Sequence, residues 1–185
     1  IALLDSKAPN ASVEAILHAL IPFRYVDHTH ANAAIAICNT EDGEQRIRKL
    51  YGDRVIVIPY VMPGFALAKL VYQLTQNVDW KAYEGMILMN HGVFTFSNDA
   101  RESYERMINL VNKAEEYLQN KNATRTAIAE GKPSVLELAL IRRNVSEIRG
   151  LPIIAQCDRS PEAVGYSNLP DLPSFAAQGP LTPDH

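Results

Sequence analysis

Apolar residues recur along the chain at two different spacings. A repeat of three or four residues is typical of a helix with one buried face, and it predicts six helices. They span residues 12–20, 31–38, 42–51, 64–76, 99–120 and 134–149. Short apolar runs rich in β-branched residues instead predict strands. These runs are residues 23–28, 54–60, 85–96 and 152–157, the first of which we expect to be buried.

The ends of several segments carry residues that start or stop helices. Ser12 and Asp99 each precede an apolar repeat and can cap a helix, and Gly52 follows the polar helix predicted over residues 42–51. The mixture of strands and helices lacks a regular alternation, which favours a layered α/β or α+β domain over a doubly wound sheet. In the longest helix we expect one apolar stripe, made of Tyr104, Met107, Ile108, Val111 and Leu118.

The C-terminal segment differs in composition from the rest of the chain. Residues 160–185 hold five of the eleven prolines and show no strong apolar periodicity. Such a segment is typical of an extended arm or a linker. We therefore predict one domain over residues 1–159, followed by a Pro-rich arm or linker over residues 160–185.

The overall composition is that of a globular protein. Of the 185 residues, 47% are hydrophobic and 21% are charged, which excludes wholesale disorder and allows a sizeable core. No apolar stretch approaches the roughly 20 residues that cross a bilayer, and the start lacks the features of a signal peptide. A net charge of −3 argues against a general nucleic-acid binder. Cys38 and Cys157 stand alone, as expected of reduced thiols in a cytoplasmic protein.

Two histidines lie close together at the end of a predicted strand. Side chains two apart on a strand point to the same face, so His28 and His30 can converge on one point. Because a neutral imidazole is a good zinc ligand, this pair offers half of a metal site. Two ordinary polar residues at a strand end are the alternative interpretation.

A third histidine lies where the longest apolar run breaks, at Asn90-His91-Gly92. We expect an unusual backbone conformation there, which Gly92 would permit. By itself His91 could also be a turn residue without a special role. Taken together, the three histidines leave a fourth position open, which is typical of a catalytic rather than a structural zinc.

The first predicted helix adds a carboxylate. Glu14 and His18 are four residues apart and share a helix face. Their neighbours are mostly apolar, and such surroundings tend to raise a carboxyl pKa, as a general base near neutral pH requires. A solvent-facing pair is the alternative. Ser12 can cap the helix or bind an anion, and we interpret His18 as a packing neighbour of the site rather than a ligand.

These motifs resemble the class II aldolase/adducin family. The resemblance rests on Ser12-x-Glu14-x3-His18, on His28-Thr29-His30 and on Asn90-His91-Gly92, and it runs from about residue 9 to residue 120. The sequences IPFRYVDHTHANAAIA and AQGPLTPDH resemble one subgroup in particular. In that subgroup a rhamnulose-1-phosphate aldolase is joined to a short-chain alcohol dehydrogenase.

The resemblance implies a fold, a metal site and a reaction. The fold would be a three-layer α/β/α domain with a central, mostly antiparallel sheet. Zinc, or another divalent transition metal, would be held by His28, His30 and His91, with Glu14 as the catalytic acid/base and Ser12 binding substrate. The reaction would cleave a ketose 1-phosphate, such as rhamnulose 1-phosphate, to dihydroxyacetone phosphate and an aldehyde. Members of the family are commonly tetramers with sites at subunit boundaries.

One departure from the family pattern concerns phosphate binding. Members usually carry a Gly/Asn-containing loop before the glutamate, whereas residues 1–10 contain no glycine and Val13 replaces one serine of a pair. We expect either that this loop lies outside the chain or that the substrate differs. A sugar-phosphate epimerase or dehydratase with the same metal site is an alternative. A non-catalytic adducin-like interaction module is another, although such modules lose the histidines that this chain keeps.

Overall fold

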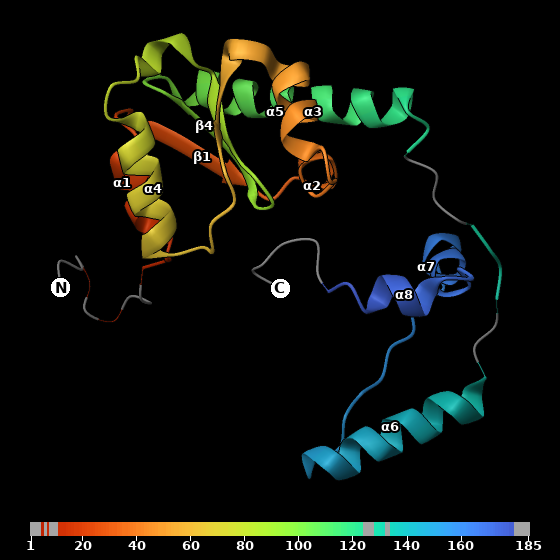
Figure 1. Ribbon diagram of the computed structural model, residues 1–185. Helices are drawn as coiled ribbons and strands as arrows, with labels where there is room; N and C mark the ends of the chain where they lie inside the picture. Colours follow the sequence, from red (N-terminus) through yellow and green to blue (C-terminus); the bar gives the residue numbers. More distant parts are fainter. Residues whose placement is uncertain (1–4, 6, 8–10, 124–127, 132–133, 180–185) are drawn as a thin grey trace. The chain divides into compact units, whose positions relative to one another are not determined.

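The computed structural model describes residues 5, 7, 11–123, 128–131 and 134–179 (Figure 1). Contacts divide the chain into two compact units, one up to Ala123 and one from Thr124 to Gly179. Each unit is described by itself below. Within the described residues, no helix is both long enough and apolar enough to cross a membrane.

A four-stranded sheet forms the centre of the first unit. Its strands are β1 (Tyr25–Thr29), β2 (Val55–Ile58), β3 (Gly85–Leu88) and β4 (Gly92–Ser97), in the order β1-β4-β3-β2. The pairs β1–β4 and β4–β3 are antiparallel, and β3–β2 is parallel. The prediction of a mostly antiparallel sheet is therefore confirmed.

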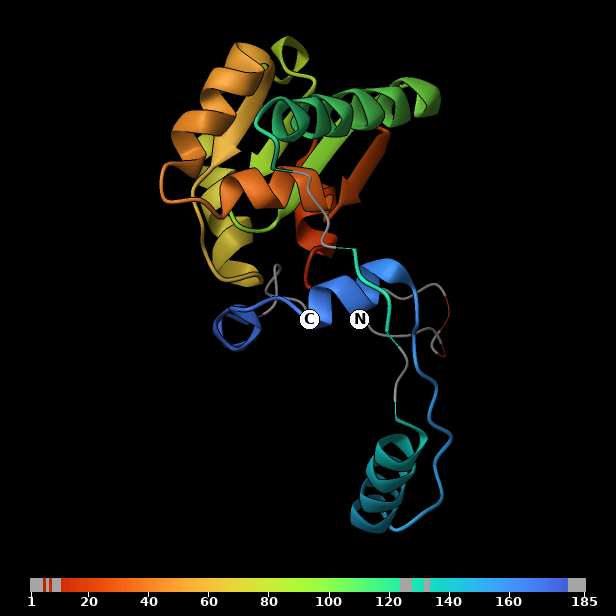
Figure 2. The ribbon, with the colours of Figure 1, turned by 90° about the vertical axis from the view of Figure 1, so that its right-hand side faces the viewer.

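Helices cover both faces of this sheet, which confirms the predicted three layers. On one face lie α1 (Ala15–Leu20) and α4 (Phe65–Thr75). On the other lie α2 (Asn32–Cys38), α3 (Gly43–Tyr51) and α5 (Ala100–Asn120). Figures 1 and 2 show the two groups of helices on opposite sides of the strands. Short 3-10 turns, Gly52–Arg54 and Trp80–Ala82, lead into β2 and toward β3.

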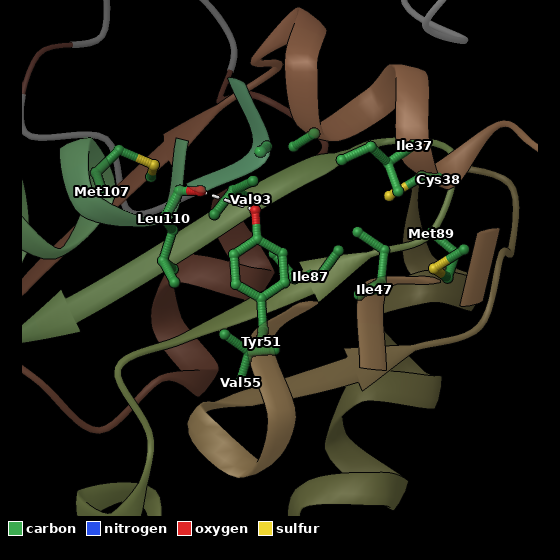
Figure 3. Close-up of a cluster of buried hydrophobic side chains, with 12 residues drawn as sticks. Ile37, Cys38, Ile47, Tyr51, Val55, Ile87, Met89, Val93, Met107 and Leu110 are labelled. Carbon is green, nitrogen blue, oxygen red and sulfur yellow. Dashed lines mark hydrogen bonds between the residues drawn. The ribbon is translucent and has the colours of Figure 1, made fainter. Parts of the chain in front are cut away.

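Burial on both faces explains why the inner strand β3 is a continuous apolar run. In β3, Met86 and Leu88 pack toward α1 and α4, while Ile87 packs toward α2, α3 and α5. The core between the sheet and α2, α3 and α5 also encloses a hydrogen bond, which the Tyr51 hydroxyl donates to the Leu110 carbonyl at 2.8 Å (Figure 3). Burial raises the pKa of Tyr51, so its hydroxyl keeps the proton that it donates.

The first helix begins later than predicted. The Ser12 hydroxyl accepts the backbone N–H of Glu14, and the Ser12 carbonyl accepts the N–H of Ala15. These bonds close a turn before the helix, so α1 starts at Ala15 and Glu14 occupies its N-cap position. The predicted cap at Asp99 is confirmed, since its carboxylate accepts the N–H of Glu102.

One prediction about burial in the first unit was wrong, and a second was wrong in part. The strand expected to be buried is β1, which lies at a sheet edge and has no fully buried residue. In α5, Met107 is buried and Val111 and Leu118 pack against the same core, as predicted. Tyr104 and Ile108 are instead 61% and 41% exposed, whereas Leu110 and Ala114, outside the predicted stripe, are fully buried. Helical spacing alone allows several faces, and the contacts of α5 with β4 and α2 select the one that is buried.

The second unit contains three helices in the part that the structure describes. They are α6 (Val135–Arg149), α7 (Pro161–Ser167) and α8 (Leu172–Ala176). The first confirms a predicted helix, capped by Ser134. It has no buried residue, and most of its aliphatic side chains are exposed.

The segment predicted to be an extended arm or a linker, residues 160–185, contains the helices α7 and α8 in its described part, and residues 180–185 lie outside the described residues. Ser160 caps α7 through the N–H of Ala163, and Pro161 occupies the first turn. A serine followed by a proline is a recognised helix start, which the high proline content obscured. The predicted boundary at residue 159 falls inside the second unit.

The strand predicted over residues 152–157 does not form. The backbone of Ile153 instead bonds to side chains of α6, accepting from Arg142 Nε and donating to Ser146 Oγ. An apolar run becomes a strand only where another strand pairs with it, and none of the described strands lies in this unit.

The two cysteines should differ sharply in reactivity. Cys38 is 2% exposed and burial raises its pKa to about 11, whereas Cys157 is partly exposed. Because the thiolate is the reactive form, we expect one fast thiol per chain with a disulfide reagent at pH 8. The second thiol should react only as fast as the protein unfolds. Cys157→Ser should remove the fast phase, and a fast phase that survives this change would contradict the assignment.

Candidate metal centre

Four side chains from separate segments of the first unit meet at one end of the sheet. Glu14 is the N-cap of α1, His28 lies in β1, His30 follows that strand, and His91 lies between β3 and β4. One carboxylate oxygen or ring nitrogen from each lies within 4.8 Å of the others. These four residues, called the His/Glu cluster below, could hold a metal ion.

Strand geometry explains the positions of His28 and His30. His28 pairs with Phe94 across the antiparallel ladder, and its imidazole lies on the face covered by α1 and α4. His30 comes two residues later, and its ring centroid lies 4.8 Å from that of His28. The convergence predicted from the spacing of these two histidines is present in the structure.

The turn between β3 and β4 carries the third histidine. Asn90 has a positive φ of 57°, and the N–H of His91 donates to the Leu88 carbonyl at 3.2 Å. A left-handed backbone suits asparagine better than most residues. The unusual conformation expected at Gly92 is therefore found at Asn90 instead.

Gly92 is needed for a different reason, which is space. A Cβ atom there would lie 2.5 Å from the Thr29 carbonyl oxygen and 3.0 Å from the rings of His28 and His30. Real Cβ atoms do not approach other atoms so closely, so only glycine lets the turn lie against the end of β1. This close approach brings His91 to the other two histidines.

The carboxylate of Glu14 lies among the three imidazoles. Its Oε1 is 2.7 Å from His91 Nε2, 3.1 Å from His28 Nε2 and 3.9 Å from His30 Nε2. The Glu14 side chain is 19% exposed, whereas that of His91 is 2% exposed. The carboxylate therefore combines close contact with the histidines and some access to solvent.

The protonation of His28 follows from its surroundings. Its Nδ1 lies 2.9 Å from the Val93 carbonyl, which can only accept, so Nδ1 carries the hydrogen. Burial lowers the pKa of His28 to about 4 and outweighs the opposing attraction of Glu14. The ring is therefore neutral at pH 7, with the lone pair of Nε2 directed at Glu14.

This arrangement suits a bound cation. His28 Nε2 is buried and makes no hydrogen bond with the described residues, yet it lies 3.1 Å from a carboxylate oxygen. A lone pair and a carboxylate attract each other only through a proton or a cation between them. Three imidazoles and one carboxylate are also the donor types that divalent transition metals take.

The other two residues of the first motif, His18 and the predicted substrate-binding residue Ser12, lie outside the cluster. His18 is exposed and touches the edge of the Phe94 ring, with centroids 5.4 Å apart. Ser12 is exposed, and its hydroxyl accepts the N–H of Glu14. Sequence reasoning missed Val93 and Phe94, both of which contact His28. Their only signal is membership of an apolar strand, since the register with β1 is a tertiary feature.

Comparison with known proteins places the chain in a family. Residues 2–118 match the Class II Aldolase and Adducin N-terminal domain, so the chain belongs to this family. This confirms the family resemblance of the sequence motifs.

Two relatives extend the comparison. Over 196 residues the chain is 31% identical to the uncharacterized oxidoreductase YuxG of Bacillus subtilis (strain 168), covering 99% of the chain and 28% of that protein. The N-terminal class II aldolase domain of a conserved protein from Thermoplasma acidophilum is 38% identical, with a TM-score of 0.54. That match covers 62% of this chain and 51% of the other. The chain thus spans about a quarter of the length of the Bacillus subtilis protein and about half of the Thermoplasma acidophilum domain structure.

Replacing Gly92 by alanine should weaken metal binding because the cluster depends on its close approach. The new Cβ would meet the Thr29 carbonyl at 2.5 Å, so the turn or the end of β1 must shift. We expect at least a tenfold loss of Zn²⁺ affinity, of the size seen when ligand-supporting contacts are lost. The free energy of unfolding should fall by about 1–3 kcal/mol, as for other overpacked sites.

Gly43→Ala is the matched control. Its Cβ would lie 2.3 Å from the Cys38 carbonyl between α2 and α3, so the clash with backbone is equally severe. Competition with a chromophoric chelator measures the affinity, and urea unfolding measures the stability. Equal Zn²⁺ affinity in Gly92→Ala and the unmodified protein would contradict the role given to Gly92.

Proposed function

We propose that the chain is the aldolase part of a metal-dependent lyase. Its substrate would be a ketose 1-phosphate such as rhamnulose 1-phosphate, cleaved reversibly to dihydroxyacetone phosphate and an aldehyde. The observation that carries the proposal is the His/Glu cluster, in a domain that belongs to the class II aldolase and adducin family.

The proposed ligands are His28, His30 and His91, and the proposed metal is Zn²⁺. Their ring nitrogens lie close enough together for one ion, and His28 is already in the neutral form that binds metals. Co²⁺, Mn²⁺ and Fe²⁺ suit the same donors when they are available. When bound, such an ion supplies Lewis-acid polarisation of a carbonyl oxygen.

Glu14 is proposed as the catalytic acid/base. Cleavage of a carbon–carbon bond next to a carbonyl leaves a carbon that must take up a proton, and the reverse reaction removes it. The carboxylate lies among the three imidazoles and is 19% exposed, so a substrate that binds at this site would meet its Oε1. Its backbone is held at the N-cap of α1, which fixes the position from which the proton moves.

Ser12 is proposed to bind substrate. Its oxygen accepts the N–H of Glu14, and its own hydroxyl hydrogen is available for an oxygen atom of the substrate. The contact with Glu14 would place that substrate oxygen beside the proposed acid/base.

We also propose that the chain functions within a larger, cytoplasmic protein with a dehydrogenase domain, and that it assembles as a homo-oligomer, a tetramer in the family. The relative from Bacillus subtilis is described as an oxidoreductase, and the chain covers 28% of it. Val13 and Ile16, on either side of Glu14, are 60% and 43% exposed, which suits a site next to another subunit.

The proposed activity is tested by metal analysis together with a retro-aldol assay. The purified chain should hold about one equivalent of Zn²⁺ and release dihydroxyacetone phosphate from at least one of a panel of ketose 1-phosphates. His28→Ala should lose metal and cleavage together, because it removes one of the three proposed ligands. Epimerised or dehydrated sugar without cleavage would instead favour an epimerase or dehydratase. Absence of stoichiometric metal would contradict the whole proposal.

A second test separates the acid/base from the ligands. Glu14→Gln should keep its metal but lose cleavage by about 10²–10⁴-fold, because an amide cannot exchange the proton. The exposed Glu44, in α3, provides a control as Glu44→Gln. Loss of metal in Glu14→Gln would make Glu14 a ligand, and unchanged turnover would remove it from the mechanism.

A further inference from the structure

The ring of Phe94 lies flat against the imidazole of His28. The two residues are directly opposite each other in the β1–β4 ladder, and residues so placed interact through their side chains. Their ring centroids are 4.0 Å apart and their planes differ by 15°. The other ring contacts within the His/Glu cluster are edge-on, with interplanar angles of 63°, 74° and 78°. The contact between His28 and Phe94 is therefore a true stack, unlike the contacts of the three imidazoles with one another.

Phe94 itself is held firmly. It is 0% exposed and belongs to the core between the sheet, α1 and α4. The ring of His18, from α1, contacts it edge-on with a centroid distance of 5.4 Å. Phe94 is therefore packed between α1 and the imidazole of His28, and it cannot move away without disturbing the core.

Two contacts together determine the orientation of the His28 ring. The hydrogen bond from Nδ1 to the Val93 carbonyl sets the direction of the ring within its plane. The stack on Phe94 sets the plane itself. An imidazole has only two side-chain torsions, so these contacts leave Nε2 directed at Glu14 and the other histidines.

We propose that Phe94 is a positioning residue that holds the His28 imidazole in its metal-binding orientation. The inference rests on the proposed metal site. A ring that is already oriented loses little conformational freedom when it binds an ion, so the contact raises affinity without touching the metal. With the hydrogen bond to Val93 alone, the imidazole could still rotate about the axis of that bond, and the stack on Phe94 prevents this rotation.

Phe96 provides a matched control within the same strand. It lies two residues along β4, on the same face and in the same core, and it is also 0% exposed. Its ring stacks on Phe23 at 4.9 Å, away from the histidines. Phe94→Leu and Phe96→Leu therefore remove the same atoms from the same core, but only the first removes the stack on His28.

The experiment measures Zn²⁺ affinity by competition with a chromophoric chelator for the full chain and both variants. We expect Phe94→Leu to weaken binding by about tenfold or more, and Phe96→Leu to stay within about twofold of the unmodified protein. Urea unfolding should show similar losses of stability in the two variants. In the metal-free protein, the His28 ring protons should lose an upfield NMR shift in Phe94→Leu alone, because that shift comes from the stacked ring.

The possible outcomes separate this inference from the proposed function. If the unmodified protein binds no Zn²⁺, the metal site itself is refuted. If it binds Zn²⁺ and the two variants bind equally well or are equally weakened, Phe94 has no positioning role. Should a leucine variant fail to fold, Phe94→Met and Phe96→Met fill more of the volume without a ring, and the same comparison applies.

Discussion

The candidate metal centre depends on one close approach, that of Gly92 to the end of β1. A side chain at residue 92 would overlap the Thr29 carbonyl and both neighbouring imidazoles. Because Gly92 has none, the β3–β4 turn lies against the end of β1, and His91 reaches His28 and His30. The close contact continues into the sheet as strand pairing, since Thr29 pairs with Val93 and His28 pairs with Phe94. The site is thus built from two strand ends and a turn.

Burial of the sheet on both faces gives this site its rigidity and its electrostatics. The cores under α1 and α4 and under α2, α3 and α5 leave β3 and β4 without exposed residues. The same burial keeps His28 neutral and lets Val93 set its tautomer. The carboxylate of Glu14 comes from a different layer, at the start of α1, and lies partly open to solvent. Glu14 is more accessible than His28 and His91, although not than His30, and a carboxylate within reach of solvent suits the acid/base role proposed above.

The two units of the chain differ in how they relate to known proteins. The family match ends at residue 118, within the first unit, whereas the similarity to the protein from Bacillus subtilis extends over 99% of the chain. The helices α6, α7 and α8 therefore lie outside the family domain. This second unit shows how local sequence signals can be misinterpreted. Five prolines suggested an extended arm, yet Ser160 and Pro161 start a helix.

The helices and strands of the first unit were predictable because their periodicity is encoded within a few neighbouring residues. The convergence of His28 and His30 was predictable for a similar reason, since side chains two apart along an extended segment share a face. Local spacing did not show that β1 is an edge strand, that Asn90 rather than Gly92 takes the left-handed backbone, or that Phe94 stacks on His28. Each of these depends on which strands pair and in which register. Pairing and register are determined by contacts between residues more than 60 positions apart, and these contacts exist only in the folded chain.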